Sequence, residues 1–282
     1  MPNLKIGVPS KGRLAELANG ILRQAGLRFR RQDRSLFARV RDMPIDVTFL
    51  RTDDIPVLCA EGAIDMGITG SDLVSESAVA VNQRLKLGIG KCRLALCVPD
   101  SNDAKSVKDL NNVRLATTFP VTTSAWLQEQ GVNAHMVKLS GSVEIMIALG
   151  VADAIVDLVE TGSTLAANRL RILDEIGSYE TILIQNPDCT DPMADRVVRR
   201  LEGVVIARSY SLLEYNVPRS ELDAAKEITP GFNSPTVSAL EDGEWCAVRA
   251  MVKKNELIDV MEKLEAVGAH AILETEIANC RL

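Results

Sequence analysis

The clearest hydrophobic pattern in the chain lies between Ala152 and Leu165. The run from Ala154 to Val159 is apolar apart from Asp157, which is typical of a buried strand. The hydroxyl-rich tract Thr161–Thr164 follows, and then a helix-like stretch from Leu165 to Leu170. A strand, a small loop and a helix start commonly hold a phosphate, because N–H groups and hydroxyls converge there and the helix dipole favours negative charge. The same pattern also occurs where Ser or Thr merely caps a helix, so both interpretations stay open.

The first part of the chain alternates strand-like and helix-like periods. Apolar runs predict strands, and amphipathic stretches with Asp N-caps or a terminal glycine predict helices. The predicted elements are the strands Lys5–Val8, Ile45–Leu50 and Asp65–Gly70, the helix Leu14–Ala25, and a helix that begins at Asp53–Pro56. Repeated strand–helix units of this kind indicate an α/β layered fold.

A second strand–helix series begins near Lys91. Its predicted elements are the strands Arg93–Val98, Val113–Thr117 and His135–Leu139, and the helices Val121–Gln130 and Ser142–Leu149. A polar, turn-rich tract at Asn186–Pro192 and a helix at Met193–Leu201 suggest a return to the first series. We therefore expect two lobes, residues 1–90 with 184–211 and residues 91–183, with a ligand cleft at the carboxyl ends of their strands.

The last part of the chain has a different rhythm. Its predicted elements are the strands Leu212–Asn216, Thr236–Leu240, Trp245–Val252 and Ala271–Glu276, and the helices Arg219–Lys226 and one capped by Asn255. This β-α-β-β-α-β order within about 70 residues is the ferredoxin-like pattern. It predicts a separate C-terminal domain over residues 212–282.

Composition narrows the class of protein. The 282 residues suit about two domains and a sizeable core. A formal net charge of −6 argues against broad nucleic-acid binding, so any phosphate specificity must come from local cations such as Lys11, Arg13 and Arg51. We expect no signal peptide and no membrane span, and hence a cytoplasmic location, since no basic leader or stretch of about 18 apolar residues is found.

Several kinds of site are disfavoured. The six cysteines form no C-x-x-C pair and no zinc-ligand spacing with the two histidines, so we expect reduced, structural cysteines. Neither histidine lies beside a nucleophile motif, which disfavours Ser-His-Asp and Cys-His enzymes. There is no G-x-x-x-x-G-K-[ST] loop, and Gly88-Ile89-Gly90 lacks the third glycine of a dinucleotide fingerprint.

Taken in order, these motifs resemble the ATP phosphoribosyltransferase family in its long, self-regulated form. The resemblance covers essentially all 282 residues. It is carried by Pro9–Leu14, Leu50–Pro56, Asp65–Leu73, Ala152–Leu165, Pro230-Gly231, Ser234–Thr236 and the ending Cys280–Leu282. It implies a periplasmic-binding-protein-like catalytic core of two lobes followed by the ferredoxin-like domain.

The resemblance implies a glycosyltransferase reaction, the first step of histidine biosynthesis. N1 of the ATP adenine attacks C1 of phosphoribosyl pyrophosphate, and pyrophosphate leaves with the help of Mg²⁺. The loop Thr161–Leu165 (Thr161, Gly162, Ser163, Thr164, Leu165) would cradle the 5′-phosphate, with Asp157 beside the ribose. The expected catalytic cations are Lys11, Arg13 and Arg51, and the further substrate-binding residues are Asp72, Leu73, Glu144, Asp153 and Glu160.

Plainer interpretations of these residues stay open: surface charges for the cations, a helix cap for Asp72, and an ordinary helix opening for Glu144. The residues indicate no obligatory general base or metal ligand. The adenine nitrogen is itself a nucleophile, so positioning and electrostatics would carry most of the catalysis.

For the C-terminal domain the resemblance implies feedback inhibition by histidine, with AMP as a further inhibitor and a homo-oligomer from dimer to hexamer. The expected effector residues are Asn216, Phe232, Ser234, Thr236, Met251 and Ala271. Some relatives have an acid where this chain has Asn216, and an acid would pair with the ammonium group of histidine. The alternative is that this domain only builds the oligomer.

Two rival functions remain. One is a binding protein whose two lobes close on a small solute without chemistry. The other is a phosphoribosyltransferase that acts on another base, although the paired acids of nucleobase salvage enzymes are represented here only by Asp157 after Val156.

Overall fold

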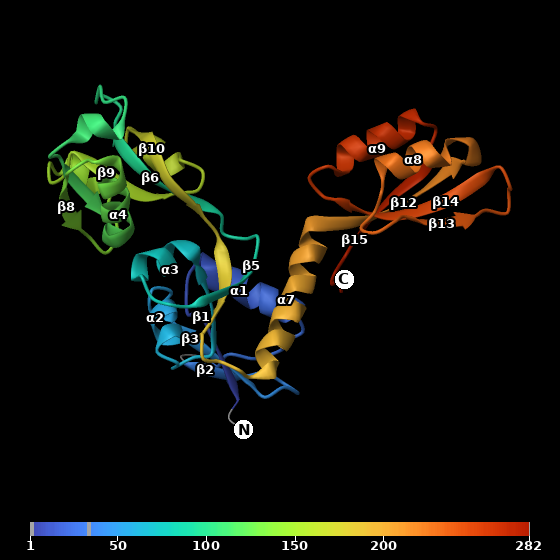
Figure 1. Cartoon of the computed structure of the whole chain (residues 1–282), viewed down its shortest axis with the longest axis horizontal. Coiled ribbons are helices and arrows are strands. Elements are labelled where there is room, and N and C mark those ends of the chain that lie inside the picture. The colour runs from blue at the N-terminus through green and yellow to red at the C-terminus, as the bar shows by residue number, and fades with distance from the viewer. Residues whose placement is uncertain (1–2, 33–34, 282) are drawn as a thin grey trace. The chain divides into compact units, whose positions relative to one another are not determined.

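The computed structural model describes residues 3–32 and 35–281, which form two compact units (Figure 1). The first unit holds residues up to 20 and residues 27–195, and the second holds residues 21–26 and 196–282. None of the helices in the described ranges combines the length and apolarity that a membrane span requires.

One sheet of the first unit has the strand order β2-β3-β1-β4-β11-β5. Its strands are β1 (Leu4–Pro9), β2 (Phe37–Arg39), β3 (Ile45–Leu50), β4 (Met66–Gly70), β5 (Asn82–Lys86) and β11 (Thr181–Gln185). Because β1 runs parallel to both β3 and β4, the carboxyl ends of these three strands share one edge. The helices α1 (Arg13–Gln24), α2 (Asp54–Ala60) and α3 (Ser71–Ser77) begin just beyond that edge.

The other sheet of the first unit has the order β10-β6-β9-β7-β8. Its strands are β6 (Cys92–Pro99), β7 (Arg114–Thr117), β8 (His135–Lys138), β9 (Ala154–Val159) and β10 (Leu170–Tyr179). The strands β7, β8 and β9 are parallel, so their carboxyl ends also share one edge. The segments beyond that edge lead to α4 (Pro120–Gln130), α5 (Ile145–Ala148) and α6 (Ser163–Ala167).

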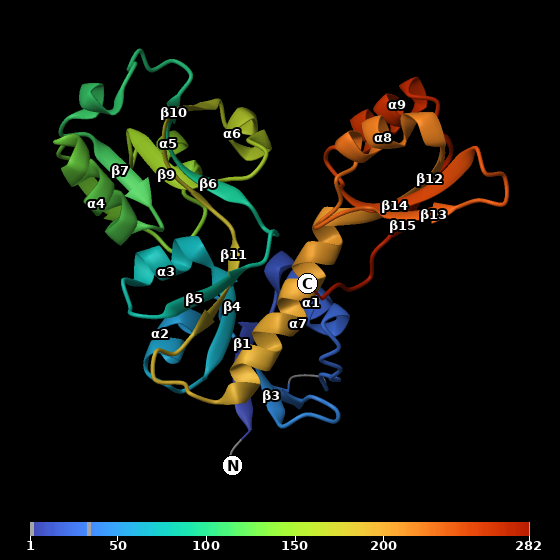
Figure 2. The ribbon, with the colours of Figure 1, turned by 45° about the vertical axis from the view of Figure 1, so that its right-hand side comes forward.

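Both faces of this second sheet are buried, which explains the nearly continuous apolar runs. Leu94, Leu96 and Val98 of β6 pack with Phe119 and Leu127 beside α4. The alternate residues of β6, Ala95 and Cys97, pack in a second core with Val143 and Leu165, near α5 and α6. Figure 2 shows α4 and α6 on opposite sides of the sheet. A strand covered on both faces has no polar side to alternate with.

The chain passes between these two sheets twice. It leaves the first sheet after β5 and enters the other at β6, and it returns from β10 to β11 across Glu180. Glu180 fastens this crossing: its N–H donates to Ser71 Oγ at 3.1 Å, and its carbonyl accepts from Ser71 N at 2.9 Å. Two sheets joined by two crossing segments form the two-lobed, periplasmic-binding-protein-like core that the sequence predicts.

The second unit contains the C-terminal sheet, in the order β13-β14-β12-β15. Its elements are β12 (Tyr210–Pro218), η2 (Arg219–Glu221), α8 (Leu222–Ile228), β13 (Thr236–Ala239), β14 (Trp245–Lys253), α9 (Leu257–Ala266) and β15 (His270–Glu276). The long helix α7 (Pro192–Ser209) precedes them. Leu213, Tyr215 and Val217 of β12 pack with Ala225 of α8 and Leu264 of α9, so both helices lie on one face. The ferredoxin-like prediction is confirmed.

Some elements differ from the sequence prediction. The stretch Leu165–Leu170 is not one helix: α6 ends at Ala167 and β10 begins at Leu170. The strand β10 escapes a periodicity argument because two register shifts break its pairing with β6 and leave most of its residues half-buried. The helix expected over Ser142–Leu149 is only Ile145–Ala148, since Gly141 and Ser142 both have positive φ. The helix expected over Met193–Leu201 continues to Ser209.

Candidate functional site

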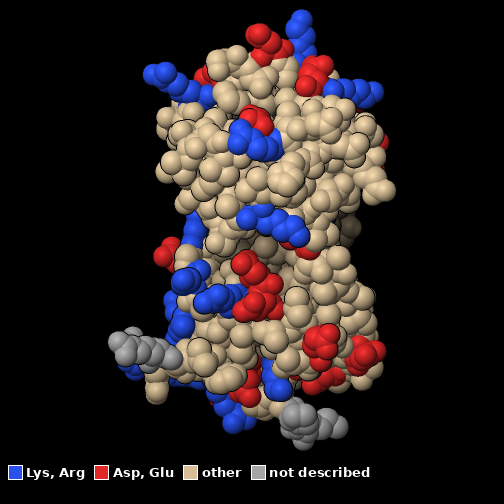
Figure 3. All heavy atoms as spheres, turned by 90° about the vertical axis from the view of Figure 1, so that its left-hand side faces the viewer, with Lys and Arg blue, Asp and Glu red and all other residues tan. Residues whose placement is uncertain are grey.

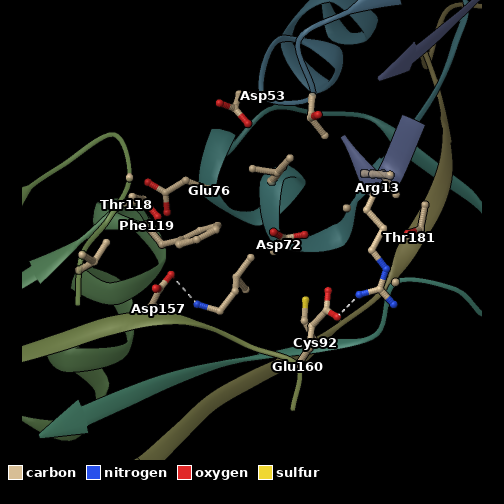
Figure 4. A pocket seen from close by; sticks show the side chains of 18 of the residues that line it. Arg13, Asp53, Asp72, Glu76, Cys92, Thr118, Phe119, Asp157, Glu160 and Thr181 are labelled. Carbon is tan, nitrogen blue, oxygen red and sulfur yellow. Dashed lines mark hydrogen bonds and ion pairs between the residues drawn. The ribbon is translucent and has the colours of Figure 1, made fainter. Parts of the chain in front are cut away.

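A cavity of about 600 Å³ lies within the first unit, between the carboxyl edges of its two sheets. From the first sheet it is lined by Arg13, Thr52, Asp53, Asp72, Leu73 and Glu76, and from the second by Thr118, Phe119, residues 140–143, Asp157, Leu158 and Glu160. Figure 4 shows side chains from both sheets facing one another across this space. The volume is in the range of ligand pockets, and the place is where open α/β sheets bind ligands.

Asp72 is the most buried acid of the cavity, with 7% of its surface exposed. It lies in the first turn of α3, directly after β4. Burial raises the pKa of its carboxyl, the N–H groups of Asp72 and Leu73 lower it, and the charge of Asp53 raises it again. Gly70 makes this arrangement possible, because a Cβ there would collide with the Asp72 carboxyl. Asp72 is thus a shielded carboxylate at the cavity wall that also accepts from N–H groups at the start of α3.

Asp157 lies in β9, two residues before the strand ends at Val159. Its Oδ1 accepts a hydrogen bond from the N–H of Leu158 at 2.8 Å. Burial raises the pKa of its carboxyl, this hydrogen bond lowers it, and the charge of Glu144 raises it. The side chain is half-buried and lines the cavity, which places an acid where a sugar hydroxyl can bind.

The hydroxyl-rich loop after β9 leads into the short helix α6. Gly162 has a φ of 80°, a left-handed conformation that favours glycine, and it directly precedes the helix. Thr161 Oγ1 and Ser163 Oγ lie 3.0 Å apart and share a hydrogen bond. The first-turn N–H groups of a helix have no partner within the helix, so this loop offers backbone donors together with hydroxyls.

Arg13 and Glu160, which both line the cavity, form an ion pair. Arg13 Nη1 donates to Glu160 Oε2, and Figure 4 shows the contact as a dashed line. The two side chains are 71% and 46% exposed, so the pair is solvated and weakly held. An anionic ligand can therefore compete for the Arg13 guanidinium.

The lining of the cavity is mostly acidic among its charged side chains. Asp53, Asp72, Glu76, Asp157 and Glu160 face one cation, Arg13, among the lining residues that the structure describes. These acids also affect the thiol of Cys92: burial and the charges of Asp72 and Glu160 raise its pKa to about 11. On the face drawn in Figure 3, basic and acidic side chains both lie near the middle. An anionic ligand would therefore enter this cavity more easily with a cation bound to it.

The structure does not bring every predicted site residue to this cavity. Arg13, Asp72, Leu73, Asp157 and Glu160 line it. Lys11 and Arg51 are exposed on the loops that follow β1 and β3, at the same edge of the sheet. The predicted site residues that are not part of the described cavity lining are Lys11, Arg51, Glu144, Asp153, Thr161, Gly162, Ser163, Thr164 and Leu165.

Two of these residues have other surroundings. Asp153 lies before β9, at the end of the strand away from Glu160, and its carboxylate accepts from Arg114 N, Nε and Nη2 at 2.7–3.1 Å. Leu165 is buried in the core beside α6. The rest of the loop Thr161–Leu165 adjoins Glu160, a lining residue.

Several lining residues were not predicted from the sequence: Glu76, Cys92, Thr118, Phe119, residues 140–143 and Thr181. Thr118 directly follows β7 and residues 140–143 come one residue after the end of β8, so the strand-end rule that pointed to Asp72 would have found them. Cys92, interpreted as purely structural, lies at the cavity wall. All six cysteines are free thiols.

Five of the six predicted effector residues line two separate cavities of the second unit. Asn216, Thr236 and Ala271 line one of about 300 Å³, together with Glu214 and Arg249. Phe232 and Met251 line another of about 260 Å³, where the Phe232 and Tyr210 rings lie 5.5 Å apart. The two cavities share no lining residue among those described, and Ser234 is in neither lining.

Comparisons with known proteins agree along the whole chain. A family model described as ATP phosphoribosyltransferase matches residues 51–203, and one described as HisG, C-terminal domain, matches residues 207–279. The ATP phosphoribosyltransferase of Rhodopirellula baltica is 64% identical over 281 residues, with 99% of this chain and 94% of the relative covered. That of Saccharopolyspora erythraea is 42% identical, with 99% and 100% covered.

Solved structures show the same fold. The ATP phosphoribosyl transferase (HisG:HisZ) complex from Thermotoga maritima matches with a TM-score of 0.63 and 31% identity, over 72% of this chain and 98% of that chain. A putative L-cystine ABC transporter protein from Listeria monocytogenes matches with a TM-score of 0.52 and 16% identity, over 74% and 92%. The second likeness is one of fold alone.

Proposed function

Because this chain belongs to the ATP phosphoribosyltransferase family, a family of glycosyltransferases, we propose that it transfers the phosphoribosyl group of phosphoribosyl pyrophosphate to N1 of ATP. The chain is an enzyme of histidine biosynthesis, at its first step. The observation that carries the reaction is the cavity itself, in which Asp157 and Glu160 of one sheet oppose Asp72 and Arg13 of the other. In this proposal ATP lies against the first sheet's side of the cavity and phosphoribosyl pyrophosphate against the second sheet's side.

In this proposal the second sheet holds phosphoribosyl pyrophosphate. The 5′-phosphate accepts hydrogen bonds from the N–H groups and hydroxyls of residues 161–165, and Asp157 accepts one from a ribose hydroxyl. The adenine of ATP lies against the first sheet, near Asp72 and Leu73. We keep the division into residues 1–90 with 184–211, residues 91–183 and residues 212–282 as part of the same proposal.

The chemical step needs no protein nucleophile. The lone pair of adenine N1 forms a bond to C1 of the ribose, and the bond from C1 to the pyrophosphate oxygen breaks with its electron pair leaving on pyrophosphate. Positive charge develops at C1, as in other glycosyl transfers, and Asp157 lies where a carboxylate opposes it. Arg13, with Lys11 and Arg51 on neighbouring loops, supplies positive charge for the leaving group.

The residues fit a magnesium ion that arrives on the substrate. No group of three or more His, Cys, Asp or Glu side chains converges on a metal position in the part of the chain that the structure describes. Mg²⁺ commonly takes only one or two carboxylates together with substrate phosphates and water, and Asp72 or Asp157 would be that carboxylate. Bound in this way, the ion neutralises charge on pyrophosphate and lets an anion enter an acidic cavity.

Regulation by histidine is proposed for the C-terminal domain. The cavity with Asn216, Thr236 and Ala271 also contains Glu214 and Arg249, joined through Arg249 Nε and Glu214 Oε1 at 2.8 Å. An acid and a base side by side suit the ammonium and carboxylate of an amino acid. As a further inhibitor, AMP would compete with substrate at the cavity of the first unit. The chain would form homo-oligomers. Because ATP is one of its proposed substrates, we propose a cytoplasmic location.

The decisive test is pyrophosphate release by the full chain with ATP, phosphoribosyl pyrophosphate and Mg²⁺. We expect release that stops when a chelator removes the metal and that falls when histidine is added. Adenine and uracil in place of ATP should give no release. Folded protein that binds both substrates without releasing pyrophosphate would support the solute-binding alternative, and release with a free base would support a salvage enzyme.

A further inference from the structure

Glu76 joins the two sheets of the first unit at the wall of the cavity. It lies on α3, which follows β4 of the first sheet. Its Oε1 accepts a hydrogen bond from the N–H of Val121 at 2.9 Å, and its Oε2 accepts one from the N–H of Thr122 at 2.9 Å. Both donors belong to α4, which follows β7 of the second sheet. We call this pair of hydrogen bonds the Glu76 bridge; Figure 4 shows Glu76 facing Thr118 and Phe119.

The helix α4 depends on this bridge because its own sequence supplies no cap. Its N-cap residue is Phe119, which has no side-chain oxygen, and its first residue, Pro120, has no N–H. The first donors of the helix are therefore those of Val121 and Thr122, and Glu76 accepts from both. A carboxylate at a helix N-terminus is favoured by the unpaired N–H groups and by the helix dipole.

The position of the bridge gives it a consequence for substrate binding. Asp72 and Leu73 lie on the same helix as Glu76, and Thr118 and Phe119 come just before Pro120 and the donors. Fixing Glu76 on α4 therefore fixes the spacing of these two walls. Leu73 of α3 also packs against the core of the second sheet, whereas the ion pair of Arg13 with Glu160 is largely exposed and so contributes little to that spacing.

We propose that Glu76 is a positioning residue that holds the two cavity walls at the spacing at which both substrates bind. The inference rests on the proposed reaction for its kinetic readout. Without the bridge each substrate still contacts its own wall, but the partner wall is held less firmly at that spacing. Both KM values then rise, while the chemical step of the filled enzyme changes little.

The test compares Glu76→Ala and Glu76→Gln with the full-length wild type. For Glu76→Ala we expect the KM of ATP and of phosphoribosyl pyrophosphate each to rise about tenfold, the size expected when charge-assisted hydrogen bonds are lost, with kcat within about twofold. Glu76→Gln keeps one acceptor oxygen and should give intermediate KM values. Hydrogen–deuterium exchange of a peptide with Val121 and Thr122 should be faster in both variants.

Asp109 provides the matched control. Its Oδ2 accepts from the N–H groups of Lys105 and Ser106 at 2.8 and 3.0 Å, so it also makes two charge-assisted hydrogen bonds to backbone N–H groups, but to neighbours in its own stretch of chain. Asp109→Asn should lower thermal stability and leave both KM values unchanged. A Glu76→Ala enzyme with lower kcat and wild-type KM values, or an Asp109→Asn enzyme with equally raised KM values, would overturn the proposal.

The two proposals fail differently. An inactive, folded wild type would overturn the proposed reaction. An active Glu76→Ala enzyme in which Val121 and Thr122 exchange as slowly as in the wild type would overturn the Glu76 bridge alone.

Discussion

At the scale of single residues, Asp157 combines a position at the cavity wall with an environment that disfavours its charge. Its carboxyl is half-buried, and burial raises its pKa above the ordinary value of 3.8 despite the hydrogen bond from Leu158 N. We expect Asp157→Asn to lower kcat/KM at least about tenfold, the effect of one lost carboxylate interaction. Because asparagine keeps the acceptor for Leu158 N and removes the buried charge, the Tm at pH 7 should not fall. Steady-state kinetics and calorimetry of the same preparation measure both.

The effect of Asp157 on the free energy of unfolding depends on pH, and the direction of its pKa shift sets the sign of that dependence. With a raised pKa, the native Asp157 binds more protons than the unfolded chain between pH 3.8 and the raised value. Asp157 therefore makes the protein less stable as the pH rises through that window, and Asp157→Asn removes the loss. Asp109 is the opposite case: N–H groups of Lys105 and Ser106 lower its pKa, so Asp109→Asn should lose stability above the ordinary carboxyl pKa. A fall in Tm for Asp157→Asn at pH 7 would contradict this account.

Residue identity alone could locate Asp157 but not Glu76. Asp157 interrupts an apolar run just before a hydroxyl-rich loop, so the pattern singles it out. No sequence pattern distinguishes Glu76 from other acids on helix surfaces. Its partners Val121 and Thr122 are 45 and 46 residues away along the chain. Contacts of that kind arise from packing of two sheets, which no local pattern records.

At the scale of elements, the loop before α6 depends on one left-handed residue. Gly162 has a φ of 80° with open space where a Cβ would lie. Gly162→Ala should therefore cost about 1–2 kcal/mol of stability through backbone strain. It should also raise the KM of phosphoribosyl pyrophosphate, since the loop donates to the 5′-phosphate in the proposed reaction. Denaturant unfolding and substrate titrations measure the two effects.

Gly131 is the matched control for Gly162. It has a φ of 69°, also with open space around its Cβ position, and it ends α4 away from the cavity. Gly131→Ala should show a similar loss of stability and an unchanged KM. Equal KM values in both variants would remove the loop Thr161–Leu165 from the phosphate site.

The start of α3 gives a second element-scale prediction. Gly70 has ordinary backbone angles, but a Cβ there would collide with the Asp72 carboxyl. Gly70→Ala should expel that carboxyl from its place beside the N–H groups of Asp72 and Leu73 and lower kcat/KM for ATP about tenfold, as for other lost charge-assisted contacts. Gly20→Ala in α1, with open space, should instead stabilise the protein by about 0.5–1 kcal/mol. A fully active Gly70→Ala enzyme would show that Asp72 does not contact ATP.

Elements were predictable where one physical rule decided them. The strand β9 and the parallel strands before it follow from apolar runs, and their shared carboxyl edge follows from their direction. The strand β10 was not predictable, because its pairing with β6 shifts register between Ile172 and Asp174 and again between Glu175 and Gly177. Bulges of this kind move side chains between faces, which removes the alternation that marks a strand.

At the scale of the whole molecule, the proposed regulation couples a histidine site in one unit to the substrate cavity in the other. The two effector cavities make different predictions, because Asn216 lies in one and Met251 in the other. An acid in place of Asn216 would pair with the ammonium group of histidine. We expect Asn216→Asp to lower the histidine concentration for half-inhibition about tenfold, as for one charge-assisted hydrogen bond, with kcat unchanged in its absence. Thr236→Val, in the same cavity, should raise that concentration, and Met251→Ala should leave it unchanged.

Calorimetric titration of histidine into each full-length variant separates binding from inhibition. A Met251→Ala protein that no longer binds histidine, beside an Asn216→Asp protein of wild-type affinity, would move the effector site to the Phe232 cavity.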